Sequence, residues 1–272
     1  MKAQRIISPT AAILLLAAAG AARGALPSHE SFDYPDGISI SGQTGGIGWT
    51  NIGWTTVTGN GTITTEDGTL TYPGIVSGGG KMRFTGVPLT GSTTTSYRGL
   101  TNALSSGTYY FRYIAQSLND SRRYFGLGLF GAAERALLGQ GSGYETWTLN
   151  HVDGITNGVV TNTLVSAVDT SDLSLLVLRV DFLPGNERVT FWVNPDLSQP
   201  ENAATAVGGS SFTTDVDYVS ITRVRVGGGG WHAAFGDPTD HYPDEIEISP
   251  ISPFAPPGLA CTNAAGTVAV AG

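Results

Sequence analysis

The stretch LSLLVLRVDFLPGNERVTFWVN, residues 173–194, decides the fold class of this chain. Apolar and polar residues alternate on both sides of the Pro-Gly-Asn sequence at 184–186, which is typical of two antiparallel strands joined by a tight turn. The face of the first strand that carries Leu176 and Leu178 is apolar, and the opposite face is nearly as apolar. We therefore predict that residues 173–182 form a strand in the middle of a sheet, with a further layer over its second face.

The composition of the 272-residue chain is also typical of an all-β protein. Glycine occurs 38 times and charged residues make up only 13%, which suits many strands and tight turns better than long surface helices. Many short strands in one unit predict two packed antiparallel sheets, a jelly-roll sandwich. Within this pattern we expect residues 62–65 and 69–72 to form a small hairpin over the Asp-Gly sequence at 67–68.

The N-terminus has the features of a secretory signal peptide. Lys2 and Arg5 precede an apolar run at residues 11–22, which is too short to span a bilayer. Small residues at 22 and 24 predict cleavage after Gly24, and a short buried helix is the alternative. We therefore expect a signal helix at 1–24 and a secreted, extracellular or cell-surface protein without a membrane span.

The net charge limits the kinds of ligand that the protein binds, and the cysteine count limits its disulfides. Removing Lys2, Arg5 and Arg23 takes the basic count from 14 to 11 against 22 acidic residues, so the net charge changes from −8 to −11. This charge argues against nucleic acid or an anionic membrane surface as partner, and favours a neutral or cationic ligand. Cys261 is the one cysteine, so no internal disulfide forms.

Four local patterns in this chain resemble one superfamily. They are SFDYPDG with GQTGGIGW (31–49), FGLGLFGAAERALLGQG (125–141), LLVLRVDFLPGNERVTFWVNP (175–195), and YVSITRVRVGGGG leading to PDEIEIS (218–249). The chain resembles secreted bacterial proteins of the concanavalin A-like lectin and glucanase superfamily, which includes laminin-G-like modules. The resemblance implies an all-β, two-sheet antiparallel jelly-roll sandwich over residues 25–249.

The resemblance also implies that the first and last strands, at 30–34 and 244–248, are neighbours. The Pro-rich and small-residue segment at 250–272 is then a disordered tail. Members with these patterns are mostly uncharacterised, so the resemblance bears on the fold more than on the function.

The segment GGGGWHAAFGDPTDHYPD, residues 227–244, is the best candidate for a binding loop. An aromatic ring such as Trp231 suits stacking on the face of a sugar, and His232 lies beside it. Trp192 is a further candidate because it alternates with Phe191 and lines either the concave face or the boundary with the second sheet. The alternative is a surface loop in which Trp231 covers the edge of a sheet.

The same loop suggests a metal site. Asp237, Asp240 and Asp244, together with backbone carbonyl groups, have the oxygen ligands that calcium prefers. The resemblance is consistent with this, because calcium often shapes loops at the rim of the sandwich in the superfamily. We therefore expect calcium as a possible cofactor.

Catalytic motifs are absent from the sequence. The Glu-x-Asp-x-x-Glu motif of the superfamily's glucanases does not occur, and neither does a Gly-x-Ser-x-Gly elbow. The glycines at 126, 128 and 131 match a nucleotide-binding pattern, but no helical period follows them. Two acidic pairs, Glu245 with Glu247 and Asp215 with Asp217, share strand faces that we expect to be solvated.

These observations favour a secreted, non-catalytic, lectin-like module that binds an extracellular or cell-surface glycan. One alternative is a glycan-degrading hydrolase or lyase on the same fold, which needs paired acids or a Tyr/His/Arg cluster in a cleft. The other alternative is a structural protein of the cell surface or matrix. The oligomeric state does not follow from the sequence.

Overall fold

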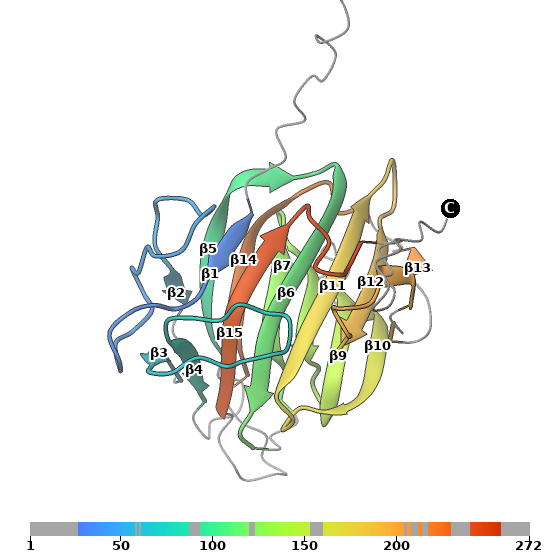
Figure 1. The fold of residues 1–272 in the computed structure, drawn as a ribbon. Helices are drawn as coiled ribbons and strands as arrows, with labels where there is room; N and C mark the ends of the chain where they lie inside the picture. The colour runs from blue at the N-terminus through green and yellow to red at the C-terminus, as the bar shows by residue number, and fades with distance from the viewer. Residues whose placement is uncertain are drawn as a thin grey trace, which may run out of the picture.

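The computed structural model consists of two antiparallel sheets packed face to face (Figure 1). It describes residues 27–57, 59, 61–86, 93–119, 123–152, 160–203, 206–207, 212–213, 217–229 and 240–256. The signal sequence that we predict at 1–24 lies outside the described residues. No helix in the described part of the chain is long and apolar enough to cross a membrane.

Sheet I contains β1 (Ser28–Glu30), β3 (Thr62–Glu66), β4 (Lys81–Thr85), β6 (Gly107–Ser117), β11 (Ser174–Phe182), β12 (Arg188–Val193), β13 (Phe212–Thr213) and β15 (Asp240–Ser249). Their order is β13-β12-β11-β6-β15-β4-β3, and β1 pairs with β15. A short 3-10 helix, η1 (Glu201–Ala203), follows β12.

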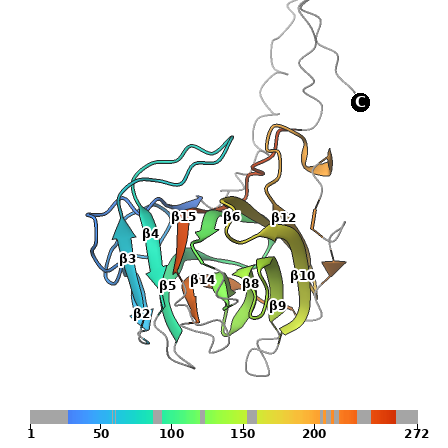
Figure 2. The ribbon, with the colours of Figure 1, turned by 90° about the horizontal axis from the view of Figure 1, so that it is seen from below.

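Sheet II contains β2 (Thr55–Val57), β5 (Thr93–Leu104), β7 (Phe125–Phe130), β8 (Glu134–Gln140), β9 (Thr146–Val152), β10 (Val160–Asp169) and β14 (Ile221–Gly229). Their order is β10-β9-β8-β7-β14-β5-β2. Figure 2 shows the sandwich from its end, with β15, β6 and β12 in one layer and β14, β8 and β9 in the other. The predicted fold class, an all-β sandwich of two antiparallel sheets, is confirmed.

The predicted hairpin at 173–194 is β11 and β12. Leu178 lies directly opposite Phe191, and both side chains are buried in the core between the sheets. β11 lies between β6 and β12, so it is an interior strand, as its two apolar faces predict. Strand pairing on both sides and burial on both faces explain why this stretch has so few polar residues.

A third layer of chain covers the outer face of sheet I. Loop 67–80 crosses in front of β15 and β6 in Figure 1, and segments 194–203, 206–207 and 250–256 lie farther along the same face. Together with sheet I they enclose a second apolar cluster of Leu70, Tyr110, Ile114, Leu175, Val177, Trp192, Leu197, Ala206 and Phe254. Residues 250–256, which the sequence assigned to a tail, therefore pack on the sandwich, whereas residues 257–272 lie outside the described part.

The first and last strands are neighbours, as the resemblance implies. Ser28 lies opposite Ile248 and Glu30 lies opposite Ile246. The first strand is nevertheless shorter and begins earlier than the predicted 30–34. Phe32 has a φ of 52°, a left-handed conformation that interrupts extended pairing.

The hairpin predicted at 62–72 is wrong. β3 pairs with β4 instead, and Thr64 lies opposite Arg83. Residues 69–72 belong to the loop over sheet I, where Leu70 is buried in the second apolar cluster. Burial of Leu70 outweighs the tendency of the Asp-Gly sequence to form a hairpin turn, so residues 69–72 do not pair with β3.

Candidate functional site

The outer face of sheet II carries polar and aromatic side chains whose positions follow from the strand pairing. Val224 faces the core, so Arg223 and Arg225 on either side of it project outward. Arg225 lies level with Gly128 of β7 and with Tyr97 of β5. Arg225 therefore lies between a position without a side chain on β7 and an aromatic residue on β5.

A hollow of about 210 Å³ opens on this face. Its lining residues come from β8, β9, β14, the residue before β7 and the turn after β8. They are Tyr124, Glu134, Leu137, Ser142, Asn150, Val152 and Arg225. The mixture of one aromatic ring, an ion pair, an amide and a hydroxyl is typical of a binding site for a polar ligand.

Glycines make room for this hollow. Gly126 lies level with Gly227 on one side and with Gly139 on the other, so three adjacent strands lack side chains at this level. A Cβ atom on Gly128 would come within 3.0 Å of Glu134 Oε1 and 3.4 Å of Arg225 Nε. The Gly-x-Gly pattern therefore lets other side chains approach the sheet, and the strand β8, not a helix, follows it.

An ion pair forms one wall of the hollow. Arg225 Nη2 donates to Glu134 Oε1 at 2.6 Å, and the guanidinium carbon lies 4.9 Å from the centre of the Phe130 ring. Burial raises the pKa of Glu134, although the positive charge of Arg225 opposes this shift. Burial also raises the pKa of Tyr124, so its phenol group remains a hydrogen-bond donor at neutral pH.

Two polar atoms of the lining side chains are left without a hydrogen-bond partner. They are Arg225 Nε and Asn150 Oδ1, and both are buried. Buried polar groups in proteins are nearly always hydrogen-bonded, and each exception needs an explanation. Arg225 Nε therefore has one unused donor and Asn150 Oδ1 has unused acceptor capacity beside the hollow.

Several predicted site residues lie outside the described part of the chain. They are Trp231, His232 and Asp237. Gly229 is the last described residue before them, and its N–H donates to the carbonyl oxygen of Tyr124 at 2.9 Å. The predicted loop therefore leaves β14 beside a residue that lines the hollow.

Trp192 lies on the other sheet. Its side chain points to the outer face of sheet I, where it is 2% exposed and its ring centre lies 5.0 Å from that of Phe254. The ring therefore lies on the side of sheet I that faces away from sheet II, under the third layer, and not at the boundary with the second sheet. In this position a ligand from solvent has no access to the ring.

Asp240 and Asp244 are not brought together. Arg83 donates to the two carboxylate oxygens of Asp240 at 3.0 and 2.6 Å. Asp244 is fully buried and accepts hydrogen bonds from Thr69 Oγ1 and Leu70 N, both at 2.8 Å. Four residues of strand separate the two Cα atoms by about 13 Å.

This arrangement does not fit one calcium ion. Calcium needs six to eight oxygen ligands at about 2.3–2.6 Å, and Asp240 and Asp244 are each engaged with separate partners. Among the residues that the structure describes, no three of His, Cys, Asp and Glu are grouped as a metal site. Asp237 lies outside those residues, so the expectation of calcium remains a prediction.

Glu245 and Glu247 do not form an exposed acidic pair. Glu245 has a φ of 51° at an irregularity in the pairing of β15 with β6. It is 3% exposed, accepts from Gly78 N at 2.7 Å and contacts His29 Nε2 at 2.6 Å, whereas Glu247 pairs with Arg112. The expectation of a solvated face is therefore wrong for Glu245. Of the other pair, Asp217 is exposed and Asp215 lies outside the described residues.

These groups predict a pH dependence of stability. Burial raises the pKa of Asp244 to about 7, and the hydrogen bond to Glu245 raises the pKa of His29. Asp244 stabilises the fold fully below its unfolded pKa of about 4, and this contribution is lost as the pH rises to 7. The contribution of His29 is lost as the pH rises above 6.5. We expect the free energy of unfolding, measured in urea, to fall by about 2 kcal/mol from pH 5 to pH 8.

The variants Asp244→Asn and His29→Gln serve as controls for this pH dependence. Each replaces a titrating group by a neutral one, so the slope between pH 5 and pH 8 is expected to become smaller. A wild-type protein that becomes more stable over the same range contradicts the assignment.

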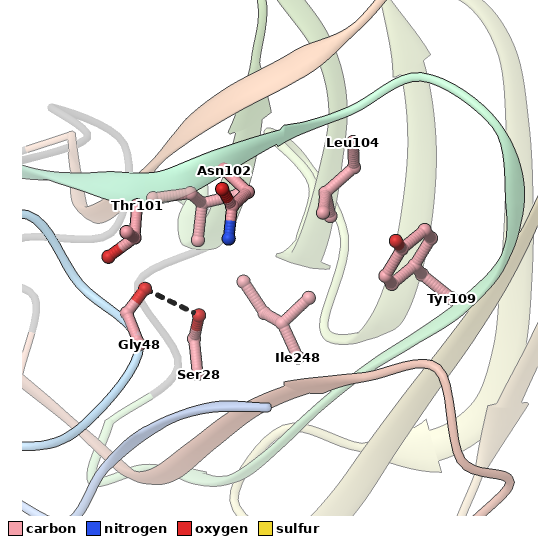
Figure 3. Close-up of a pocket in the computed structure, with 8 residues that line it drawn as sticks. Ser28, Gly48, Thr101, Asn102, Leu104, Tyr109 and Ile248 are labelled. Carbon is pink, nitrogen blue, oxygen red and sulfur yellow. Dashed lines mark hydrogen bonds between the residues drawn. The ribbon is translucent and has the colours of Figure 1, made fainter. Parts of the chain in front are cut away.

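A second hollow of about 200 Å³ lies at the end of the sandwich (Figure 3). Leu104, Tyr109 and Ile248 face it, and Ser28 Oγ already donates to the carbonyl oxygen of Gly48 at 3.0 Å. None of its described lining residues is charged. We therefore interpret it as a packing gap between the edges of the two sheets.

Comparisons with known proteins give matches only among solved structures. No family model matches the chain, and no curated protein sequence matches it. An endo-1,3-β-glucanase from Streptomyces sioyaensis has a TM-score of 0.46 and 14% identity, over 81% of this chain and 94% of its own. A laminarinase from Flavobacterium sp. UMI-01 has a TM-score of 0.46 and 12% identity, over 81% and 98%.

A lectin also matches. Lectin II from Ulex europaeus has a TM-score of 0.41 and 9% identity, over 83% of this chain and 98% of its own. At these identities and TM-scores, the matches carry no argument about the activity of this chain.

Proposed function

We propose that this protein is a secreted glycan-binding module and that its ligand lies in the hollow on sheet II. The observation that carries the proposal is the pair of buried atoms without partners, Arg225 Nε and Asn150 Oδ1, in the wall of an open hollow. Sugars present many hydroxyl groups on a ring with apolar faces. Tyr124 offers an aromatic surface and a hydroxyl group at the same site, which suits this mixed chemistry.

The binding role is non-catalytic in this proposal. Most glycoside hydrolases need two carboxyl groups, about 5–5.5 Å apart when they retain configuration and 6.5–9.5 Å apart when they invert it. Among the described residues that line the hollow, Glu134 is the one carboxylate, and Arg225 is paired with it. The raised pKa of Tyr124 also makes its phenol a poor base at neutral pH.

The loop that begins after Gly229 extends the proposed site. Trp231 and His232 are proposed to contact the ligand beyond Tyr124, because the chain enters this loop beside Tyr124. Calcium, held with the help of Asp237, is proposed to affect only this loop.

Glycan binding to the purified protein tests the proposal. We expect Tyr124→Ala and Asn150→Ala each to weaken binding of the best glycan on an array about tenfold or more, a loss of at least about 1.4 kcal/mol. Trp231→Ala tests the loop separately, and thermal unfolding with and without calcium tests the ion. Failure of every glycan to bind contradicts the proposal and favours a structural role at the cell surface. Release of new reducing ends or unsaturated sugars from a bound glycan indicates an enzyme instead.

A substitution at Gly128 is expected to close the hollow. In Gly128→Ala the new methyl group lies about 3 Å from Glu134 Oε1 and the Phe130 ring, so the side chains around Arg225 must shift. We expect glycan affinity to fall about tenfold while the protein still folds. Gly78→Ala is the matched control, because its methyl group meets no atom within 4 Å. Equal affinity of the two variants contradicts the placement of the site.

A further inference from the structure

Arg223 extends the proposed site along β14. It is exposed, and its guanidinium carbon lies 5.0 Å from the centre of the Tyr97 ring and 5.4 Å from that of Phe130. These two rings pack edge to face, with centres 5.4 Å apart. A cation over aromatic rings is held in position without losing its charge. Arg223 is therefore placed for contact with a ligand, although its side chain is solvated.

The second arginine lies on the same face. Arg223 and Arg225 are two residues apart on one strand, so their Cα atoms are about 7 Å apart. Both guanidinium carbons lie within 5.4 Å of the centre of the Phe130 ring. Arg223 and Arg225 therefore both contact the ring of Phe130.

The charges around this ring do not balance. Glu134 pairs with Arg225, and no carboxylate of the described residues lies within salt-bridge distance of Arg223. The whole chain has 22 acidic and 14 basic residues and is therefore negatively charged. The positive charge of Arg223, which has no carboxylate partner among the described residues, is opposite in sign to this net charge. Most other arginines in the described part are ion-paired, as in Arg83 with Asp240 and Arg112 with Glu247. An unpaired cation on an aromatic platform indicates an anionic partner.

We propose that the outer face of sheet II binds an acidic glycan, with Arg223 and Arg225 contacting its carboxylate or sulfate groups. This inference rests on the proposed function and assigns the chemical class of its ligand. A guanidinium group presents paired N–H donors that match the oxygen atoms of a carboxylate or sulfate. Tyr124 and Asn150 then contact the hydroxyl groups of the neighbouring sugar unit. The proposed acidic ligand differs from the expectation, drawn from net charge alone, that the ligand is neutral or cationic.

Two matched pairs of polysaccharides test the class of ligand by titration calorimetry. One pair is polygalacturonate and its methyl-esterified form, and the other is dextran sulfate and dextran. We expect the acidic member of at least one pair to bind ten times more tightly than its neutral partner, and the pair that responds identifies the anionic group. Raising the salt concentration from 50 to 500 mM is expected to weaken this binding.

Single substitutions test whether the preference for acidic polysaccharides arises from the outer face of sheet II. We expect Arg223→Gln to lose most of the preference for the acidic polysaccharide, and Arg223→Lys to keep part of it, with unfolding temperatures unchanged. Arg188→Gln removes the same charge from an exposed position on β12 of sheet I and is expected to leave the preference intact. A preference that survives in Arg223→Gln overturns the inference. Equal binding of neutral and acidic members overturns it too but leaves the proposed function standing, whereas no binding to any glycan, neutral or acidic, overturns both.

Discussion

The substitution Glu30→Gln is expected to lower the free energy of unfolding by about 3–5 kcal/mol. Glu30 and Arg98 are both 1% exposed and form an ion pair in the core, with Arg98 Nη1 3.0 Å from Glu30 Oε2. Neutralising the carboxylate leaves a guanidinium charge in a region closed to water. The cost of that unpaired charge, and not the attraction within the pair, sets the size of the effect.

Glu30 also organises the groups around it. Its side chain accepts hydrogen bonds from Trp54 Nε1 at 3.1 Å, Tyr34 Oη at 2.9 Å and the backbone N–H of Phe32 at 3.0 Å. Glutamine has only one carbonyl oxygen to replace two carboxylate oxygens, so at least one of these donors loses its partner. A buried donor without a partner costs about a further 1–3 kcal/mol, which places the expected effect at the upper end of the range.

Urea unfolding of the variant and a matched control measures this effect. Glu66→Gln is the control, because Glu66 is 32% exposed and pairs with Lys81 at 3.2 Å and Arg83 at 3.3 Å. A surface pair of this kind contributes about 1 kcal/mol or less. A loss below 1 kcal/mol for Glu30→Gln shows that water reaches Arg98 in the folded protein. The double variant Glu30→Gln with Arg98→Met is expected to recover part of the loss, since it removes the unpaired charge.

The buried ion pair of Glu30 and Arg98 could not be predicted from the sequence. Alternation predicted the hairpin of β11 and β12, because its signal lies within 22 adjacent residues, and the apolar character of both faces predicted the additional layer. Glu30 and Arg98 are 68 residues apart, and each lies in a segment with ordinary strand alternation. A charge that points into the core has the same local pattern as a charge that points to solvent, so only the assembled sheets identify it.

The candidate site was missed for a related reason. Glu134 and Arg225 are 91 residues apart, and pairing of β7 with both β8 and β14 is needed to bring them together. One signal was nevertheless present in the sequence. In the stretch Thr-Arg-Val-Arg-Val, residues 222–226, the valines occupy one face of a strand and the arginines the other. Two arginines on the outer face of a central strand indicate a charged surface there, whereas the aromatic residues favoured Trp231 and Trp192 as ligand contacts.

Trp192→Ala is expected to lower the free energy of unfolding by about 3–5 kcal/mol without changing glycan affinity. Trp192 lies opposite Val177 on the adjacent strand, and Phe254 covers its ring from the segment after β15. Removing the ring leaves a cavity in the second apolar cluster. The covering segment also loses its main aromatic contact, so the third layer is weakened along with the strand beneath it.

Two measurements on the same variant separate a structural role of Trp192 from a binding role. Urea unfolding gives the loss of stability, and glycan titration well below the unfolding temperature gives the affinity of the folded fraction. Because the hollow lies on sheet II and Trp192 packs on the outer face of sheet I, the sandwich core separates them. Trp192→Phe is the milder control, since a smaller ring still fills part of the space. Normal stability with lost binding instead supports the ligand-contacting role that the sequence pattern first indicated. Loss of stability alone shows that the third layer is an integral part of the fold, and that the site on sheet II does not depend on it.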